Sequence, residues 1–255
     1  MLQEVDLNCD LGESYGAFRI GNDKGIMPFI TSANIACGFH AGDPLTIEET
    51  IKLAIKSGIG VGAHPGYHDI EGFGRRPMKL SNDELRASIL YQVSAIKGMT
   101  EALGGKLQHV KPHGALYNAA ATDYQMSAII AAAIKDIDDT LILVGLSNSQ
   151  MLKAAKDLGI AYAAEVFADR AYNDDGTLVP RSNPGSVIHD TKQVIDRVLR
   201  MVTEQRVISV SGKEIPIQAD TICIHGDNDM ALEFAKNLSL ALKSNGIRLR
   251  SIGKR

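Results

Sequence analysis

Short apolar runs alternate with amphipathic stretches along the chain, and polar loops that contain glycine separate them. The runs are nearly continuous in hydrophobicity, which is typical of strands buried on both faces. They predict strands at VDLNCD from Val5, Ala33 to Cys37, Ile59 to Ala63, His109 to Lys111, Leu141 to Gly145, Ala161 to Phe167 and Thr221 to His225. Strands that alternate with helices pair in parallel through right-handed crossovers, so the pattern predicts an α/β fold.

The amphipathic stretches begin with recognisable helix signals. Asp43 is a predicted N-cap before Pro44, and Ser81 with Glu84 predicts a capping box. Further helices are predicted roughly at Lys24 to Ile30, Asp123 to Ile137, Ser149 to Leu158, Asp190 to Val202 and Asp227 to Ser244. The segment VISVSGKEIPIQ from Val207 alternates around Ser-Gly-Lys and predicts a β-hairpin. No linker divides the chain, so one domain over residues 1–255 is expected, while the order of elements leaves a doubly wound sheet and a closed barrel both open.

Composition narrows the classes of partner. The net charge of −3 over 255 residues argues against nucleic acid or an anionic membrane surface. No run of 18 apolar residues occurs and the N-terminus lacks a leader pattern, so a cytoplasmic protein without membrane contact is expected. Cys9, Cys37 and Cys223 form no C-x-x-C pair and are expected to pack as small apolar residues. Cys37 at a strand end leaves a nucleophilic role open, which would need a lowered thiol pKa.

Polar side chains gather just past the predicted strands. In parallel α/β folds the chemistry collects at the carboxyl ends of the strands. The candidates at these ends are Asp6, Asn8, Asp10, Glu13, His40, Asp43, His64, Tyr67, Asp69, Lys111, His113, Tyr117, Glu165, Asp169, Arg170, Tyr172, His225 and Asp227.

Four of the seven histidines follow a predicted strand and have glycine one or two residues later: His40, His64, His113 and His225. A lone histidine in such a place is more often a hydrogen-bonding loop residue than a catalyst. Four on different strands of one face favour a functional site, and the neighbouring glycines let backbone approach a ligand closely.

Asp6, Asn8 and Asp10 alternate, so their side chains share one face of the first strand. In a barrel that face points inward, where carboxylates are costly unless they are paired or hydrogen-bonded. One reading makes at least one of them a general base, and the other makes them structural anchors. Asp43 and Asp227 precede helical patterns, and N-capping is sufficient reason for them.

Lys111, Arg170 and Arg181 are the cations near these loops and suit a carboxylate or phosphate ligand. Arg181 lies in the long polar loop LVPRSNPGSV, which could act as a lid or be a solvated surface loop. The chain contains no phosphate-binding G-x-x-x-x-G-K-[ST], so any use of ATP requires another geometry or a partner. It also lacks G-x-S-x-G and H-E-x-x-H, which removes the usual support for serine hydrolases and zinc proteases.

Six blocks in order resemble the LamB/YcsF family. They are Asp6-Leu7-Asn8-Cys9-Asp10-Leu11-Gly12-Glu13, Asn34-Ile35-Ala36-Cys37-Gly38-Phe39-His40-Ala41-Gly42-Asp43, Gly62-Ala63-His64-Pro65-Gly66-Tyr67, Lys111-Pro112-His113-Gly114-Ala115-Leu116-Tyr117, Glu165-Val166-Phe167-Ala168-Asp169-Arg170 and His225-Gly226-Asp227. The resemblance runs from about residue 4 to residue 250, and the tail Ser251 to Arg255 lies outside it.

The resemblance implies a seven-stranded (β/α) barrel, similar to the TIM barrel and of the glycoside hydrolase/deacetylase type. It also implies a hydrolase that opens the cyclic amide of 5-oxoproline to give L-glutamate, coupled to hydrolysis of ATP to ADP and phosphate. The chain would be the A subunit of a 5-oxoprolinase that also needs B and C subunits, and ATP with Mg²⁺ would bind here or on a partner. The alternatives are a metal-dependent deacetylase or amidohydrolase, and a non-catalytic subunit that only binds substrate.

For this chemistry the phosphorylated lactam needs a base for water, donors for an oxyanion, and cations for anionic groups. We assign catalytic roles to Asp6, Asp10, His64, Lys111 and His113. We assign substrate or phosphate binding to Asn8, Glu13, His40, Asp69, Glu165, Asp169, Arg170, Arg181 and His225, and we assign no metal ligands.

Overall fold

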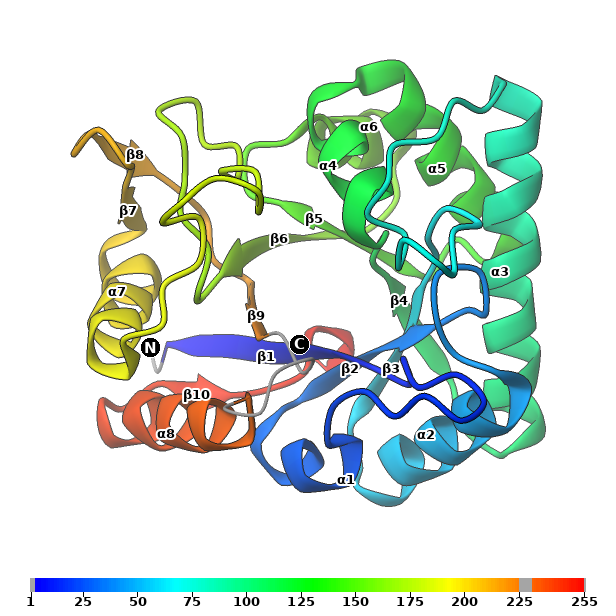
Figure 1. Ribbon diagram of the computed structural model, residues 1–255, viewed down its shortest axis with the longest axis horizontal. Helices are drawn as coiled ribbons and strands as arrows, with labels where there is room; N and C mark the ends of the chain where they lie inside the picture. The colour runs from blue at the N-terminus through cyan, green and yellow to red at the C-terminus, as the bar shows by residue number, and fades with distance from the viewer. Residues whose placement is uncertain (1–2, 225–230, 255) are drawn as a thin grey trace.

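Seven parallel strands close into a barrel in the order β1-β2-β3-β4-β5-β6-β9, and β9 pairs back to β1 (Figure 1). The computed structural model describes residues 3–224 and 231–254, so the predicted sites His225 and Asp227 lie outside the described residues. The barrel strands are β1 Glu4–Leu11, β2 Ser32–Ala36, β3 Gly60–His64, β4 Leu107–Val110, β5 Ile142–Leu146, β6 Tyr162–Phe167 and β9 Thr221–Ile224. The seven predicted strands and their parallel pairing are therefore confirmed, and of the two arrangements left open the closed barrel is correct.

Helices surround the ring of strands and pack their apolar faces against it (Figure 1). They are α1 Asp23–Ile26, α2 Pro44–Lys56, α3 Asn82–Ala102, α4 Gly114–Thr122, α5 Tyr124–Ile137, α6 Gln150–Leu158, α7 Thr191–Glu204 and α8 Ala231–Ser244, with 3-10 turns at Met27–Phe29 and Ile252–Lys254. Within the described ranges, none of these helices is long and apolar enough to cross a membrane.

The predicted caps set where two of these helices begin. Asp43 Oδ1 accepts from the backbone amides of Leu45 and Thr46 at 3.0 Å each, so this carboxylate caps α2. Ser81 and Glu84 form the reciprocal bonds of a capping box at α3. Both predicted capping roles are confirmed, and Asp43 in addition accepts from the backbone amide of Gly16 at 2.9 Å.

Three further strands of the described chain do not belong to the closed barrel, and one helix was not predicted. The predicted hairpin is present as β7 Arg206–Ile208 and β8 Glu214–Pro216. A short strand, β10 Arg248–Leu249, pairs with the start of β1. Helix α4 was not predicted, since it starts at Gly114 directly after β4 and has no side-chain cap to mark it.

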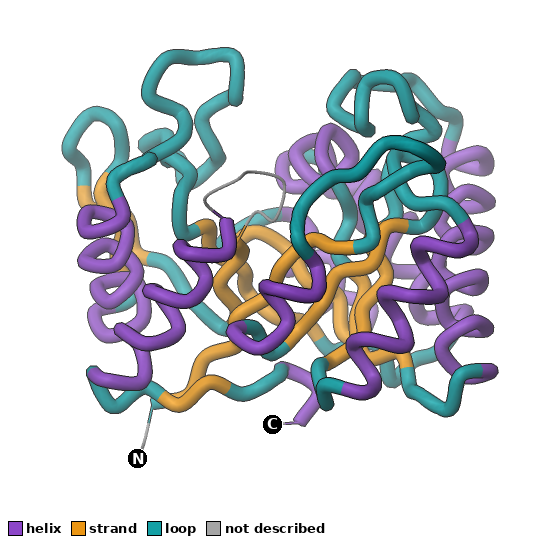
Figure 2. Tube along the Cα trace, turned by 60° about the horizontal axis from the view of Figure 1, so that its bottom comes forward, coloured by secondary structure: helices purple, strands orange, loops and turns teal. Residues whose placement is uncertain are grey.

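The long loops gather at one end of the barrel, as Figure 2 shows, and the described residues nearest both termini lie at the other end. The loop end is where the barrel strands finish, because the strands are parallel. The inward-facing side chains of β1 are buried and polar, with Asp6 at 0% and Asn8 at 1% exposure. The interior therefore carries polar chemistry toward the loop end instead of the apolar layers that usually fill such barrels.

Candidate active site at the barrel mouth

A cavity of about 440 Å³ lies among the loops at the carboxyl ends of the strands. This volume suits a small molecule. The predicted site residues that line it are Asp10, Glu13, His64, Lys111, His113, Arg170 and Arg181. Residues from β1 and β3 and from the loops that follow β1, β4 and β6 thus meet in one place.

Lys111 is the buried cation of the site, with a side chain only 2% exposed. Its Nζ lies 2.9 Å from Asp10 Oδ1, 3.0 Å from Glu165 Oε1 and 3.0 Å from Cys223 Sγ. Burial alone would lower the pKa of this ammonium, but Asp10, Cys223 and Glu165 hold that pKa well above its usual range. Lys111 is consequently charged, and its Nζ also lies over the ring of Phe167 at 5.5 Å.

Asp10 connects this cation to the histidines. Its Oδ1 accepts from Lys111 at 2.9 Å and from Asn34 Nδ2 at 2.8 Å. Its Oδ2 lies 3.3 Å from His64 Nε2. One oxygen is therefore anchored by two donors, and the carboxylate is positioned as a general base requires.

His64 and His113 point ring nitrogens at each other, with His113 Nδ1 2.9 Å from His64 Nε2. The opposite nitrogen of each ring bonds to a backbone carbonyl: His64 Nδ1 to Lys111 at 2.6 Å and His113 Nε2 to Phe73 at 2.9 Å. A carbonyl can only accept, so these two nitrogens carry the hydrogens. The two nitrogens that face each other therefore both present lone pairs when the rings are neutral.

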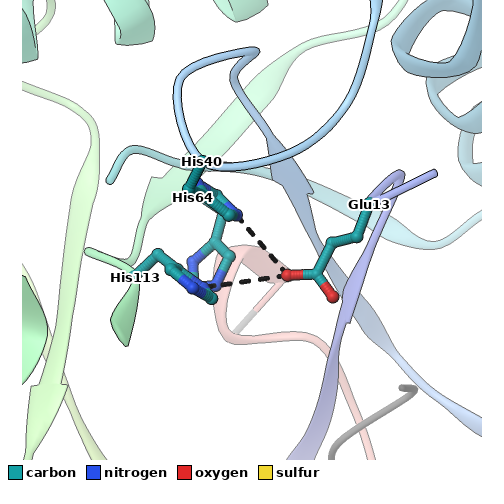
Figure 3. Close-up of side chains that lie close together, drawn as sticks. All are labelled: Glu13, His40, His64 and His113. Atoms are coloured by element: carbon teal, nitrogen blue, oxygen red, sulfur yellow. Dashed lines mark hydrogen bonds and ion pairs between the residues drawn. The ribbon is translucent and has the colours of Figure 1, made fainter. Parts of the chain in front are cut away.

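His40 stacks on His113 with ring centroids 3.7 Å apart and an angle of 4° between the planes. Burial, followed by the neighbouring histidines, lowers the pKa of His40 well below its usual range. Burial also leads the lowering of the pKa of His113. Glu13 Oε1 lies 3.5 Å from His40 Nε2 and 3.7 Å from His113 Nδ1, and Figure 3 shows this carboxylate facing the imidazoles.

The backbone between β3 and α3 makes room for the stacked rings. A Cβ on Gly74 would lie 2.7 Å from His40 Cβ and 2.8 Å from His113 Cδ2, and one on Gly66 would lie 2.7 Å from His40 Nδ1. Phe73 adopts a left-handed φ of 55°, which is costly for a residue with a side chain, and its carbonyl accepts from His113. This loop therefore holds the histidines in place through its glycines and through the backbone conformation of Phe73.

Arginines surround the outer part of the cavity. Arg170 is 4% exposed, its Nη2 donates to the carbonyl of Val179 at 2.6 Å, and burial beside Arg181 lowers its pKa to about 10. It remains charged at neutral pH. Arg181 and Arg75 line the same cavity, so guanidinium groups are available there for a carboxylate or phosphate. The loop after β6, for which a lid is one of the two predictions, contributes lining residues at Leu178, Pro180, Arg181 and Ser182.

Asp6, a predicted general base, lies deeper than the cavity. Its Oδ1 accepts from Thr31 at 2.6 Å and from Ser32 at 2.7 Å, and its Oδ2 accepts from Thr221. These hydroxyl bonds favour the structural alternative, in which Asp6 ties β1 to its neighbouring strands.

The remaining predicted residues lie behind or beside the cavity. Glu165 and Asn8 are joined at 3.0 Å behind Lys111. Asp69 binds Arg76, which lowers the pKa of the Asp69 carboxyl, and neither Asp69 nor Asp169 is among the described residues that line the cavity. Any direct contact of these residues with a ligand stays a prediction.

Several contributors were not predicted. His109 is fully buried, its Nε2 donates to Asn34 Oδ1 at 2.8 Å, and burial next to Lys111 lowers its pKa to about 3. Its signal was its place at the start of the predicted strand, two residues before Lys111. Cys223 was expected to pack as an apolar residue, but its sulfur accepts from Lys111. Burial raises the pKa of the Cys37 thiol, which argues against the nucleophilic role left open for it.

Together these features define a parallel (β/α)-barrel protein with a polar, charge-paired site at the carboxyl ends of its strands. The chain belongs to the LamB/YcsF family, whose model matches residues 5–255. It is 50% identical over 253 residues to the A subunit of 5-oxoprolinase from Geobacillus thermodenitrificans, covering 99% of this chain and 98% of that protein. It is 52% identical over 246 residues to the A subunit of 5-oxoprolinase from Campylobacter jejuni subsp. jejuni serotype O:2, covering 96% of each chain.

Solved structures agree on the fold. The lactam utilization protein from Thermus thermophilus matches with a TM-score of 0.92 and 46% identity, covering 98% of this chain and 100% of that one. A family 4 carbohydrate esterase from Streptomyces lividans matches with a TM-score of 0.54 and 13% identity, covering 98% of this chain and 93% of that one. At that identity the likeness concerns the fold alone, and it agrees with the predicted (β/α) barrel.

Proposed function

We propose that this chain is the A subunit of a 5-oxoprolinase, which opens the lactam ring of 5-oxoproline to give L-glutamate at the expense of ATP. The observation that carries the proposal is the near full-length identity of about 50% to proteins named as the A subunit of 5-oxoprolinase. The cavity supports it, because its size suits a small cyclic amide and its arginines suit the carboxylate of that substrate.

The lactam is unreactive, so ATP transfers its terminal phosphoryl group to the carbonyl oxygen, with Mg²⁺ and the B and C subunits taking part. Water then adds to the activated carbon, the carbon–nitrogen bond breaks, and the nitrogen takes up a proton, which leaves the γ-acyl phosphate of glutamate. A second water hydrolyses this acyl phosphate to L-glutamate and phosphate. ATP is a co-substrate here, and Arg75, Arg170 and Arg181 are the groups of this chain that suit its phosphates. Binding of Mg-ATP to the isolated chain distinguishes a nucleotide site here from one on a partner.

In this mechanism Asp10 takes the proton from water, and Lys111 stabilises the negative charge that develops on the substrate oxygen. The distances fit these roles, since both groups line the cavity and their side chains are 2.9 Å apart. Asp10 then passes this proton to the leaving nitrogen, and His64, whose Nε2 is 3.3 Å from Asp10, lies beside this transfer.

The proposal is tested by measuring glutamate release from 5-oxoproline and Mg-ATP, with this chain alone and with the B and C subunits added. Glutamate and ADP in equal amounts, formed only when this chain is present, is the expected result. No glutamate in any combination would refute the proposal and favour a metal-dependent amidohydrolase. Binding of 5-oxoproline by this chain without turnover, even while the partner subunits hydrolyse ATP, would instead favour a non-catalytic substrate-binding subunit.

The same assay tests the base. Asp10→Asn keeps the shape of the side chain but removes the proton acceptor, so turnover is expected to fall by about 10²–10⁴ while thermal unfolding shows a folded protein. Asp157→Asn, on the exposed face of α6, is the matched control and keeps full turnover. Full activity in Asp10→Asn would remove Asp10 from this role.

A further inference from the structure

Three histidines and one glutamate, each from a different strand end, bring four ligand atoms together beside the cavity. The residues are Glu13, His40, His64 and His113, all are buried, and one ligand atom from each lies within 4.8 Å of all the others (Figure 3). Neutral imidazole and carboxylate are ligands that first-row divalent metals prefer. Ligand type alone does not make a site, and the way the rings are held decides whether this cluster is one.

First, the ring nitrogens His64 Nε2 and His113 Nδ1 face each other with their lone pairs. His64 Nε2 and His113 Nδ1 are 2.9 Å apart, yet the opposite nitrogen of each ring donates to a carbonyl, of Lys111 and of Phe73. Neutral rings held in this way have no hydrogen to place between them and repel at that distance. A positive species between them removes the repulsion, and it must be either a proton or a metal ion.

The second observation is the orientation of the rings. A histidine that binds a metal almost always donates its other ring N–H to a carbonyl or carboxylate, which fixes the tautomer and aims the free lone pair at the ion. Both His64 and His113 have this partner already in place. The strained backbone of Phe73 supplies one of the two carbonyls, so the arrangement is held by the fold.

The third observation is His40. This ring is 1% exposed, and within the part of the chain that the structure describes neither of its nitrogens has a hydrogen-bond partner. A buried polar atom of this kind costs free energy unless something outside the protein chain binds it. Its Nε2 points to the same place as the other ligands, 3.5 Å from Glu13 Oε1.

The distances fit an ion better than a proton. Four ligands about 2.0–2.2 Å from a tetrahedral ion lie about 3.3–3.6 Å from one another. Three of the separations within the cluster, 2.9, 3.5 and 3.7 Å, bracket that range, and all of them lie within 4.8 Å, so small movements of the side chains bring the four ligands to one ion. A proton on His64 Nε2 would satisfy the His64–His113 pair and would also face Asp10 Oδ2 at 3.3 Å, but it would leave the ring nitrogens of His40 without a hydrogen-bond partner among the described residues.

We infer that Glu13, His40, His64 and His113 form a binding site for one divalent transition-metal ion, with Zn²⁺ as the best-matched occupant. Glu13, His64 and His113 also line the cavity, so a ligand that enters it reaches this site. The inference does not depend on the proposed reaction, because it concerns binding of the metal alone.

The test uses the full chain after removal of metal by a chelator and dialysis. Titration with Zn²⁺ by calorimetry is expected to give one ion per chain, and Co²⁺ is expected to give the intense visible absorption of a four-coordinate, histidine-rich site. Glu13→Gln and His40→Gln should each weaken Zn²⁺ binding by about 100-fold or more, in line with the losses caused by changes around metal sites. His189→Ala, which removes an exposed histidine outside the cluster, should bind as the unchanged protein does.

Thermal unfolding with and without Zn²⁺ gives a second measurement, the rise in Tm that the ion causes in each variant. It can be read even for a variant that is less stable than the unchanged chain. The unchanged chain and His189→Ala should gain stability from Zn²⁺, and the two ligand variants should gain little. Failure of the chelated, unsubstituted chain to take up either ion stoichiometrically would overturn the inference. So would Zn²⁺ binding of equal affinity in Glu13→Gln and His40→Gln, since the ion would then be bound elsewhere.

Discussion

At the scale of single residues, Lys111 organises the interior. Its buried ammonium lies 2.9 Å from Asp10 and 3.0 Å from Glu165, and it compensates the negative charge of both carboxylates. A buried ion pair is weak evidence for stability as a whole, but removing one partner leaves an uncompensated charge. The sensitivity of this cluster to substitution is therefore expected to be large and to depend on charge rather than on volume.

Lys111→Met retains most of the apolar stem of the side chain and removes only the ammonium. Because Asp10 and Glu165 then face each other without a cation, the free energy of unfolding is expected to fall by about 3–5 kcal/mol. Chemical denaturation measures this directly. Lys106→Met, on an exposed turn before β4, should change the same quantity by less than about 0.5 kcal/mol.

A double variant separates charge from packing. Adding Glu165→Gln to Lys111→Met removes one of the stranded charges, so part of the lost stability should return. If Lys111→Met were as stable as the unchanged chain, or if the second substitution made it weaker still, the charge-pairing account of the interior would be wrong.

At the scale of elements, β3 is shaped by what lies inside the barrel. A Cβ on Gly62 would lie 2.0 Å from His109 Nε2, and that ring is fully buried and bonded to Asn34. The imidazole of His109, on β4, thus occupies the space that a side chain at position 62 would need. Strand β3 pairs irregularly with β4 at this point, between Val61 and Gly62.

Gly62→Ala is expected to lower the free energy of unfolding by about 1–3 kcal/mol, because His109 must leave its place and lose its bond to Asn34. Gly98→Ala is a matched control in helix α3, where a Cβ meets nothing within 4 Å. It should raise stability by about 0.5–1 kcal/mol, since alanine is favoured over glycine inside a helix. If urea denaturation gave the same change in the free energy of unfolding for both substitutions, His109 would not be what excludes a side chain at position 62.

The same scale shows how far the sequence could lead. The strand runs, the capping box at Ser81 and the N-cap at Asp43 are local signals, and the structure confirms each of them. Helix α4 was missed because its start coincides with the K-P-H-G block, where Gly114 has a φ of 53° and no side chain caps the helix.

Some features of the site could likewise be predicted from the sequence, and others could not. Strand-end position predicted that His64, Lys111 and His113 would share one end of the barrel, and they line one cavity. The left-handed backbone of Phe73 and the carbonyl bonds that fix the ring tautomers depend on tertiary contacts between distant segments. No pattern along the chain carries that information, so the opposed lone pairs could be found only in three dimensions.

At the scale of the whole molecule, the two ends of the barrel differ. The cavity lies at one end, and the C-terminal segment with Ser251 and Ile252 lies at the other, which we call the floor. The 3-10 turn Ile252–Lys254 follows β10 and covers the end of the barrel opposite the cavity. Ser251 donates to Gln108 at 2.9 Å and lies 3.2 Å from the hydroxyl of Ser32. Ile252 packs with Val144 and Ala163 in a small cluster apart from the main core.

The floor is expected to stabilise the barrel without contributing to its chemistry, and Ile252→Ala tests this. Ile252 is 7% exposed, so its truncation should cost about 2 kcal/mol, near the lower end for buried isoleucine because the cluster is small. For a chain of this size that corresponds to a fall of about 4–8 °C in Tm. Ile208→Ala, at a residue on β7 that is 37% exposed, should lower Tm much less. Since the floor and the cavity lie at opposite ends, Zn²⁺ affinity below the lowered Tm should remain that of the unchanged chain. A loss of Zn²⁺ affinity in Ile252→Ala would mean that the two ends of the barrel are coupled through its polar interior, and the division of the molecule into a stabilising floor and a functional mouth would have to be abandoned.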